Sequence, residues 1–379
     1  MTPLRRTRVL IVNDSLNVGG AERVAVDIAN SLDRSRHEVL FCSTRVSGPL
    51  RSQINEDIPV NILGRSATWD IAKLFTFAKY INREQVDVIH SHGRGTMKFV
   101  ALARELRLIK ARHVFHDHFG WLHVDRGAGR GLRLALNTAV DAYIGVDQRL
   151  CDWAKDTARI DPSRVNLIRS GVDLDRFTNV VAHDLRSELD LPTDALVLMM
   201  VANFRPQKDH PTLLRAMADL TADQRERLRL IVVGSTTADV GYHAKCVEMV
   251  EHLGIDHLVR FIGARDDTPE LLAGADAAVL SSKNETGPLV VLEYMASAKP
   301  FIATDTGQIT DAVRDLRVGL IPAPRDHHEV ADALGELLEM SRDERSEMGR
   351  RGRRAAEELF SQSAAIEQVE RVYQKVLGL

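Results

Sequence analysis

Short apolar runs alternate with longer amphipathic stretches along the whole chain, and this alternation constrains the fold more than any other feature. It predicts an α/β, doubly wound architecture, because parallel strands need helical crossovers. Two series of five or six strands are more than one compact sheet usually holds, so we expect two such domains. The predicted strands are Val9–Val12, Val39–Ser43, Val86–His90, His113–His116 and Ala142–Val146, then Leu196–Val201, Arg229–Val233, Val259–Ile262, Ala277–Leu280, Phe301–Ala303 and Gly319–Ile321.

The polar stretch Asn179–Pro192 is the expected junction between the two domains. We accordingly assign residues 1–180 to an N-terminal Rossmann-like domain and residues 181–360 to a C-terminal one. Two helices are predicted at the end of the chain, over Arg342–Leu359 and Ser361–Leu377. The second of them has an apolar face, which must be buried somewhere in the fold.

Composition excludes several classes of protein. With 44% hydrophobic and 27% charged residues, the chain of 379 residues resembles an average soluble protein, not a disordered, collagen-like or disulfide-rich one. Its three cysteines are far apart and form no CxxC pair, which indicates reduced thiols in a cytoplasmic protein. No apolar stretch approaches the roughly 18 residues that a membrane span needs, so we expect a soluble protein whose membrane contact, if any, is peripheral.

Residues 94–133 form a basic stretch with nine basic side chains and three acidic ones. Such a stretch favours an anionic surface or acceptor, although a solvated face on a basic domain also explains it. Within it, residues 131–136 could form a shallow amphipathic contact with an anionic membrane. The stretch lacks interleaved aromatic side chains that would stack on bases, so we expect no nucleic-acid partner.

Two features of the N-terminal half could bind a ligand. Gly19 and Gly20 precede a predicted helix, whose free N–H groups and dipole suit a phosphate; a plain strand-to-helix turn is the alternative, and the pattern is not GxGxxG. His116 and His118 follow a strand, where ligands bind in open α/β sheets, and either could bond a sugar hydroxyl or serve a structural role. His-x-His also suggests a metal, but no further ligands stand at recognisable spacing, so we expect none.

In the C-terminal half, Arg205 and Lys208 share a short loop after the strand Leu196–Val201. Two cations at the carboxyl end of a strand can converge on a diphosphate, and each charge-assisted hydrogen bond contributes roughly 1.5–3 kcal/mol. A pair of solvated surface cations is the alternative.

The segment Ser281–Ala296 is the most specific pattern in the chain. Glu285 lies in a loop, Pro288 suits the first turn of a helix, and Glu293 lies inside that helix among apolar residues. A carboxylate there is costly to bury without partners, and two vicinal ribose hydroxyls would satisfy it. The backbone from Gly287 to Val290, with Pro288 and Leu289 between them, opens the helix, and its free N–H groups can face phosphate. Glu285 can reach the sugar end of the same ligand.

With these residues in place, the chain resembles the retaining glycosyltransferases of family 4, which have the two-domain GT-B fold, over essentially its whole length. Glu285-x7-Glu293 is similar to the family's Glu-x7-Glu signature, and Arg205 and Lys208 are similar to its diphosphate loop. Further similar stretches are Gly19–Glu22, Ser170–Phe177 and Phe261–Leu272.

The chain also departs from the family pattern at four places. Thr286-Gly287-Pro288 replaces Gly-x-Pro after the first glutamate, and Ser170 replaces an asparagine. A Gly-Gly pair is reduced to Gly307-Gln308, and Asp311 replaces a glutamate. These changes affect the identity of the donor sugar more than they affect the implied glycosyltransferase activity.

The resemblance implies transfer of a hexosyl-type sugar from a nucleoside diphosphate to an acceptor hydroxyl with retained configuration and no metal or cofactor. In this family Arg205 and Lys208 would hold the diphosphate and Glu293 the ribose. Glu285 would contact the donor sugar or phosphate region, and His116, with His118 as the alternative, the donor sugar's hydroxyls. Gly20 would let the backbone approach from the opposite domain.

The resemblance further implies that the N-terminal domain binds the acceptor and the C-terminal one the donor. Helix 361–379 would then cross back to the N-terminal domain. The acceptor could be a glycan, a lipid-linked glycan or a small natural product. A GT-B phosphorylase, a sugar-nucleotide epimerase and a catalytically idle sugar-nucleotide-binding protein are the alternatives.

Overall fold

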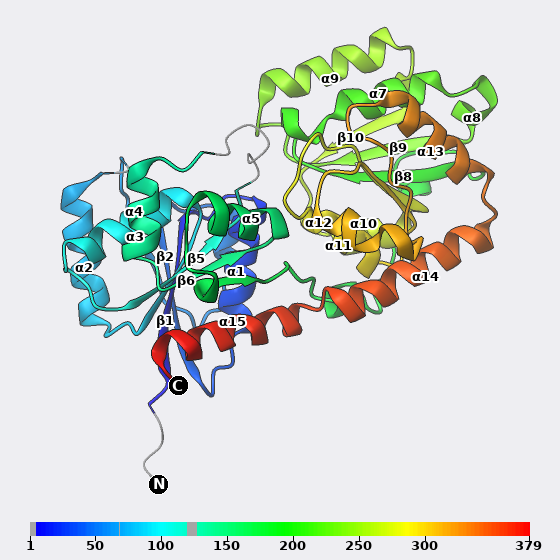
Figure 1. Ribbon diagram of the computed structural model, residues 1–379. Helices are drawn as coiled ribbons and strands as arrows, with labels where there is room; N and C mark the ends of the chain where they lie inside the picture. Colours follow the sequence, from blue (N-terminus) through cyan, green and yellow to red (C-terminus); the bar gives the residue numbers. More distant parts are fainter. Residues whose placement is uncertain (1–4, 68, 120–126) are drawn as a thin grey trace. The chain divides into compact units, whose positions relative to one another are not determined.

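The computed structural model describes residues 5–67, 69–119 and 127–379 and contains two parallel sheets (Figure 1). The chain separates into two compact units, which we call unit 1 (Met1–Ser170 with Ser363–Leu379) and unit 2 (Gly171–Gln362). Each unit is built around its own sheet. The predicted α/β class with two Rossmann-like, doubly wound parts is therefore confirmed.

The sheet of unit 1 has seven strands in the order β3-β2-β1-β4-β5-β6-β7. Strand β1, third in this order, is buried on both faces, because Val9 and Ile11 pack into one apolar cluster and Leu10 and Val12 into another. The strands are β1 (Thr7–Ser15), β2 (His37–Val46), β3 (Val60–Ile62), β4 (Val88–His92), β5 (Arg112–Asp117), β6 (Ala142–Gly145) and β7 (Val165–Leu167). The helices are α1 (Gly20–Ser31), α2 (Ile71–Arg83), α3 (Arg94–Glu105), α4 (Arg130–Thr138) and α5 (Gln148–Asp152).

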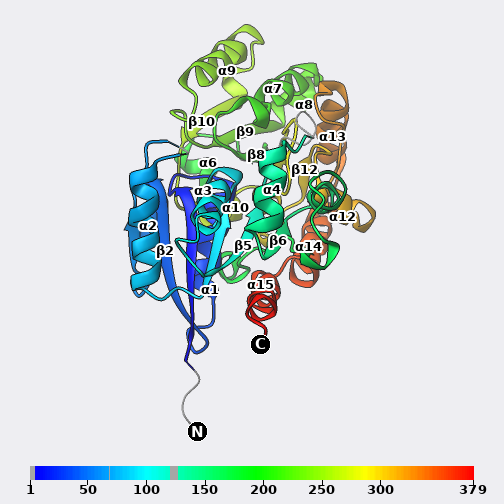
Figure 2. The same cartoon turned by 60° about the vertical axis from the view of Figure 1, so that its left-hand side comes forward.

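The last helix, α15 (Gln362–Leu377), belongs to unit 1 although it follows unit 2 in sequence (Figure 2). Its apolar face buries Val369 and Tyr373 in the same cluster as Val9 and Ile11. Glu370 on this helix is also buried and pairs with Arg36 at 2.8 Å. The C-terminal helix therefore crosses back to the N-terminal part, as expected, and its apolar face is covered there.

The sheet of unit 2 has five strands in the order β10-β9-β8-β11-β12 and encloses one continuous apolar core. The strands are β8 (Leu196–Val201), β9 (Leu228–Val233), β10 (Val259–Gly263), β11 (Ala277–Leu280) and β12 (Phe301–Ala303). The helices are α6 (Leu185–Glu188), α7 (His210–Asp219), α8 (Ala222–Glu226), α9 (Val240–His252), α10 (Thr268–Gly274), α11 (Leu289–Ala296), α12 (Gln308–Val313), α13 (His327–Glu339) and α14 (Arg342–Leu359).

Three short segments differ from the expected strands. The strands β3 and β7 were not predicted, because each has three residues at an edge of the sheet and is too short to show a period. The predicted strand Gly319–Ile321 is wrong: Leu320 forms only an isolated bridge with Ile302. One bridging residue can satisfy its backbone groups without continuing as a strand.

In each sheet, the strand order reverses direction at one point, and there the loops at the carboxyl ends of two neighbouring strands diverge. This point lies between β1 and β4 in unit 1 and between β8 and β11 in unit 2. Open α/β sheets bind ligands in the crevice that such a divergence creates.

None of the helices among the described residues has the length and hydropathy of a membrane span.

Gly234, directly after β9, packs closely against the backbone at the end of β8. A Cβ at this position would overlap the carbonyl oxygen of Ala202. We expect Gly234→Ala to lower the free energy of unfolding by about 1–3 kcal/mol, since two backbones would have to separate. Gly335→Ala is the matched control: its Cβ would meet only the flexible end of Gln224, so we expect a gain of about 0.5–1 kcal/mol from helix propensity. Urea unfolding followed by circular dichroism measures both; equal stability of the two variants would contradict the prediction.

Candidate functional site

The loops that follow β8 and β11 lie side by side at the carboxyl edge of the unit 2 sheet. The amide of Lys283 donates to the carbonyl of Gln207 at 2.8 Å, and the Ser281 hydroxyl donates to the carbonyl of Asp209 at 3.1 Å. These bonds join segments that are more than 70 residues apart in sequence. The two motifs singled out from the sequence, 205–208 and 285–293, are thereby brought to one place.

Lys208 and Glu285 form an ion pair across the two loops. The Nζ of Lys208 lies 2.6 Å from Oε1 of Glu285, which also accepts a hydrogen bond from the Ser282 hydroxyl at 2.9 Å. The two charged side chains are 22% and 17% exposed, so they are shielded from bulk solvent yet reachable by a ligand. A lysine and a glutamate held together in this way provide a cation and an anion within one ligand's reach.

A second ion pair of opposite polarity joins the same loops. Lys283 on the β11 loop lies 3.2 Å from the buried carboxylate of Asp209 on the β8 loop. Asp209 has a left-handed backbone with φ 50° and also accepts from the Thr212 hydroxyl at 2.8 Å. Sequence reasoning missed Lys283 and Asp209, because a lone lysine or aspartate in a loop carries no spacing signal.

The other predicted residues of the loops after β8 and β11 take the following places. Arg205 is exposed, and its guanidinium has no hydrogen-bond or ion-pair partner within the described parts of the chain. The helix α11 begins at Leu289 after Pro288 as N-cap, and Glu293 is half-buried in its second turn. Gly287 has φ +158°, which side chains rarely adopt, so the loop shape depends on glycine at this position.

In unit 1, the two adjacent glycines lie at the start of α1. Gly19 is the N-cap with an extended backbone of φ −158°, so the turn itself does not require glycine. Within the described residues, nothing lies within 4 Å of where a Cβ of Gly20 would stand.

Two further residues of unit 2 were expected near a phosphate. Leu289 and Val290 both lie in the first turn of α11.

The expected histidines, His116 and His118, belong to a compact group of four imidazoles. His90 and His92 point from β4 to the same face, and His92 stands opposite His116 in the strand register. Ring centroids are 4.5 Å apart for His90–His92, 5.1 Å for His92–His116 and 4.4 Å for His116–His118. His90 and His92 were missed; the signal was a second His-x-His at the end of the preceding strand.

Burial keeps the four imidazoles of this group uncharged. It lowers the pKa of His90 to about 3 and that of His118 to about 4, and it lowers the pKa values of His92 and His116 well below the usual one. Neighbouring imidazoles add to the effect for His90, His92 and His116, because each disfavours a positive charge on the next. Neutral rings can both donate and accept a hydrogen bond at pH 7.

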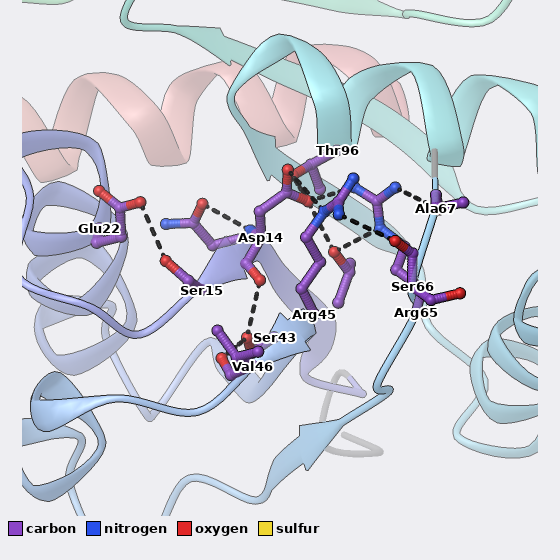
Figure 3. A network of polar contacts seen from close by, with 12 residues as sticks. Asp14, Ser15, Glu22, Ser43, Arg45, Val46, Arg65, Ser66, Ala67 and Thr96 are labelled. Atoms are coloured by element: carbon purple, nitrogen blue, oxygen red, sulfur yellow. Dashed lines mark hydrogen bonds and ion pairs between the residues drawn. The ribbon is translucent and has the colours of Figure 1, made fainter. Parts of the chain in front are cut away.

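A partly buried polar network anchors the carboxyl end of β1, the strand that pairs with β4. Figure 3 shows the carboxylate of Asp14 pointing toward Arg65 and Thr96; it accepts from the Thr96 hydroxyl at 2.9 Å and from the Thr44 hydroxyl at 2.7 Å. Burial alone would raise the pKa of Asp14, but hydrogen bonds from Thr44 and the charge of Arg65 hold it below its usual value. The network ties β1 to β2 and α3 and so fixes the loop that leads to Gly19.

The basic stretch is partly committed to internal ion pairs. Arg94 pairs with buried Asp117 at 3.1 Å, and Arg104 and Arg112 both pair with Asp141. On α4, within the predicted membrane contact, the apolar side chains pack into the core of unit 1, and only Leu134 is strongly exposed, at 61%. Residues 120–126 of the stretch lie outside the described residues. Membrane contact stays a prediction.

The chain matches two protein families in sequence. Residues 18–176 match Glycosyltransferase Family 4, and residues 182–355 match Glycosyl transferases group 1. Among curated proteins, D-inositol 3-phosphate glycosyltransferase 2 of Catenulispora acidiphila is 34% identical over 315 residues, which is 77% of this chain and 71% of the relative. N-acetyl-alpha-D-glucosaminyl L-malate synthase of Bacillus anthracis is 24% identical over 95% of both chains.

Solved structures with the same fold cover nearly the whole chain. HepE of Anabaena in complex with UDP-glucose has a TM-score of 0.83 at 20% identity and covers 99% of this chain and 100% of its own. A glycosyltransferase of Rickettsia africae has a TM-score of 0.83 at 18% identity and covers 98% of this chain and 99% of its own. The architecture is therefore that of GT-B glycosyltransferases.

Proposed function

Because the chain belongs to glycosyltransferase family 4, with a group 1 domain in its C-terminal half, we propose that it is a retaining enzyme that transfers a hexosyl residue from a nucleoside diphosphate sugar. One observation carries this proposal. The cations Arg205 and Lys208 and the carboxylates Glu285 and Glu293 stand on two loops and one helix at the reversal point of the unit 2 sheet.

The leaving diphosphate is the group that needs most stabilisation. Negative charge builds on it as the glycosidic bond breaks, and preorganised cations lower the energy of that state more than they lower the ground state. Arg205 and Lys208 would face the diphosphate together with the amides at the start of α11. These groups supply positive charge at the diphosphate, so the proposed transfer needs no metal or cofactor there.

Nζ of Lys208 lies 2.6 Å from Oε1 of Glu285. When Lys208 pairs with a phosphate oxygen in place of Glu285, the carboxylate of Glu285 can accept hydrogen bonds from sugar hydroxyls. Glu293 would bind the ribose from within α11. His116, with His118 as the alternative, would contact the donor sugar's hydroxyls. Gly20 leaves room for a ligand beside the start of α1.

Retention follows if the acceptor hydroxyl attacks from the face that the diphosphate leaves, with a phosphate oxygen taking its proton. Proton NMR of the product tests this step. A product with the same anomeric configuration as the donor supports it, and an inverted product contradicts it.

The acceptor that the relatives favour is a small, hydroxylated anion. Two of them are named for inositol 3-phosphate and for L-malate, both small anionic molecules with hydroxyl groups. Arg94, Arg104 and Arg112 of the basic stretch are engaged in ion pairs, which weakens the case for a lipid-linked acceptor. Flotation with anionic liposomes at low salt separates the two acceptor classes. If the acceptor is lipid-linked, the protein should bind the liposomes; if it is a small soluble anion, the protein should not.

Calorimetric titration with UDP, GDP, TDP and ADP tests the donor site. We expect binding of one diphosphate, with UDP the first candidate because HepE was crystallised with UDP-glucose, and much weaker binding of the matching nucleoside. The phosphates should account for the difference, since each charge-assisted hydrogen bond contributes about 1.5–3 kcal/mol. Equal affinity for nucleoside and diphosphate would contradict the assignment of Arg205 and Lys208.

A further inference from the structure

Three histidines at the carboxyl ends of β4 and β5 form a cluster that the proposed transfer does not fully use. One ring nitrogen from each of His90, His92 and His116 lies within 4.8 Å of the others. The three residues are 0%, 0% and 3% exposed. In the described part of the chain, Nε2 of His90, Nε2 of His92 and both ring nitrogens of His116 have no hydrogen-bond partner.

A buried nitrogen without a hydrogen-bond partner costs folding free energy. We therefore expect a ligand that binds these nitrogens. Two of the rings are also held by their other nitrogen. Nδ1 of His90 lies 2.6 Å from the hydroxyl of Tyr373 on α15, and Nδ1 of His92 lies 3.1 Å from Nε2 of His118. If Nδ1 donates in both bonds, Nε2 carries the lone pair on His90 and on His92. Metal-binding histidines have this arrangement, because a partner on one nitrogen sets the tautomer and orients the ring.

The chemistry of the donors selects the class of ion. Neutral imidazoles suit Zn²⁺, Co²⁺, Ni²⁺ and Cu²⁺, whereas Mg²⁺ and Ca²⁺ prefer oxygen ligands. Nitrogens up to 4.8 Å apart must approach one another to reach a common ion, since zinc–nitrogen bonds are about 2.0–2.1 Å long. Rotation of side chains that carry no competing hydrogen bond at the binding nitrogen permits this approach.

We propose that His90, His92 and His116 bind one divalent transition-metal ion, for which Zn²⁺ is the probe. The ion would fasten the end of β4 to the end of β5 and, through Tyr373, join both strands to α15. It would occupy one nitrogen of His116 and leave the other for a ligand. The proposal does not depend on the proposed transfer, because metal content is measured without any substrate.

The test uses the full chain without an affinity tag. The protein is stripped with a chelator, loaded with Zn²⁺ or Mg²⁺ and passed over a desalting column before elemental analysis. We expect about one equivalent of zinc, no magnesium and a higher melting temperature with zinc alone. Co²⁺ loading should give the visible absorption bands of a four- or five-coordinate ion. Retention of less than about 0.2 equivalents of zinc would overturn the proposal.

A surface group is the competing binding place and supplies the control. Asp219, His327 and His328 also bring ligand atoms within 4.8 Å of one another, but they are exposed or half-exposed. The double variant His327→Ala, His328→Ala should keep the zinc, while His92→Gln and His116→Ala should each lose it. Loss of zinc in the surface variant contradicts the buried site. That variant leaves the core intact, so it decides the question even if the buried variants fail to fold.

Discussion

Replacing Lys208 with alanine is expected to lower kcat by about 10²–10³-fold, because removal of one preorganised group that stabilises developing charge has this effect in enzymes. Lys208 is positioned by the pair with Glu285 at 2.6 Å and stands at the carboxyl edge of β8 and β11. The donor KM should change less than kcat, since the charge on the leaving diphosphate grows toward the transition state. Initial rates with the nucleotide sugar identified by the binding panel measure both.

Two controls separate catalysis from loop stability. Lys245→Ala removes the same charge from an exposed position on α9 and should leave kcat unchanged. Glu285→Gln breaks the same ion pair but keeps Lys208, so its melting temperature measures what the pair contributes to loop stability. If Lys208→Ala kept the activity of the natural chain at a temperature where both variants are folded, the assigned role of Lys208 would be wrong.

Replacing Glu293 with alanine is expected to weaken nucleoside diphosphate binding about 100-fold, because the loss of two hydrogen bonds to a carboxylate costs about 3 kcal/mol or more. The carboxylate lies one turn inside α11, half-buried among core residues, so a bound ribose would meet it where water is scarce. Calorimetry with UDP, or with whichever diphosphate binds, gives the dissociation constants.

A deoxynucleotide makes this second prediction specific. The 2′-deoxy form of the diphosphate should bind the natural chain about 10-fold more weakly than the ribose form, and should bind Glu293→Ala as well as the ribose form does. Glu251→Ala, at an exposed position on α9, is the control and should change neither constant. If Glu293→Ala still distinguishes the two sugars, another group reads the ribose.

Most of the fold could be predicted from local pattern. The strands Leu196–Val201 and Ala277–Leu280 have the bounds expected for them, because a buried parallel strand is a continuous apolar run between polar loops. The pattern fails where an element is too short to show a period, as in β3, β7 and the single bridge of Leu320.

The candidate donor site could be predicted in part. The spacing of Glu285 and Glu293 relative to the start of α11 is local, so the sequence indicates a loop carboxylate followed by a helical one. The direct contact between Lys208 and Glu285 and the reversed pair of Lys283 with Asp209 depend on β8 and β11 being neighbours. Strand order does not follow from the period of any one strand.

The histidines show the same division between sequence and tertiary structure. His116-Asp117-His118 stands out at a strand end, and a strand places its alternate residues on one face. Only the pairing of β4 with β5 sets His92 beside His116, and only the return of α15 puts Tyr373 against His90. The sequence by itself thus determined the elements, their alternation and the chemistry at each strand end, since these depend on residues close together in the chain. The tertiary structure decided which strand ends meet, because that choice depends on packing between segments far apart in the chain.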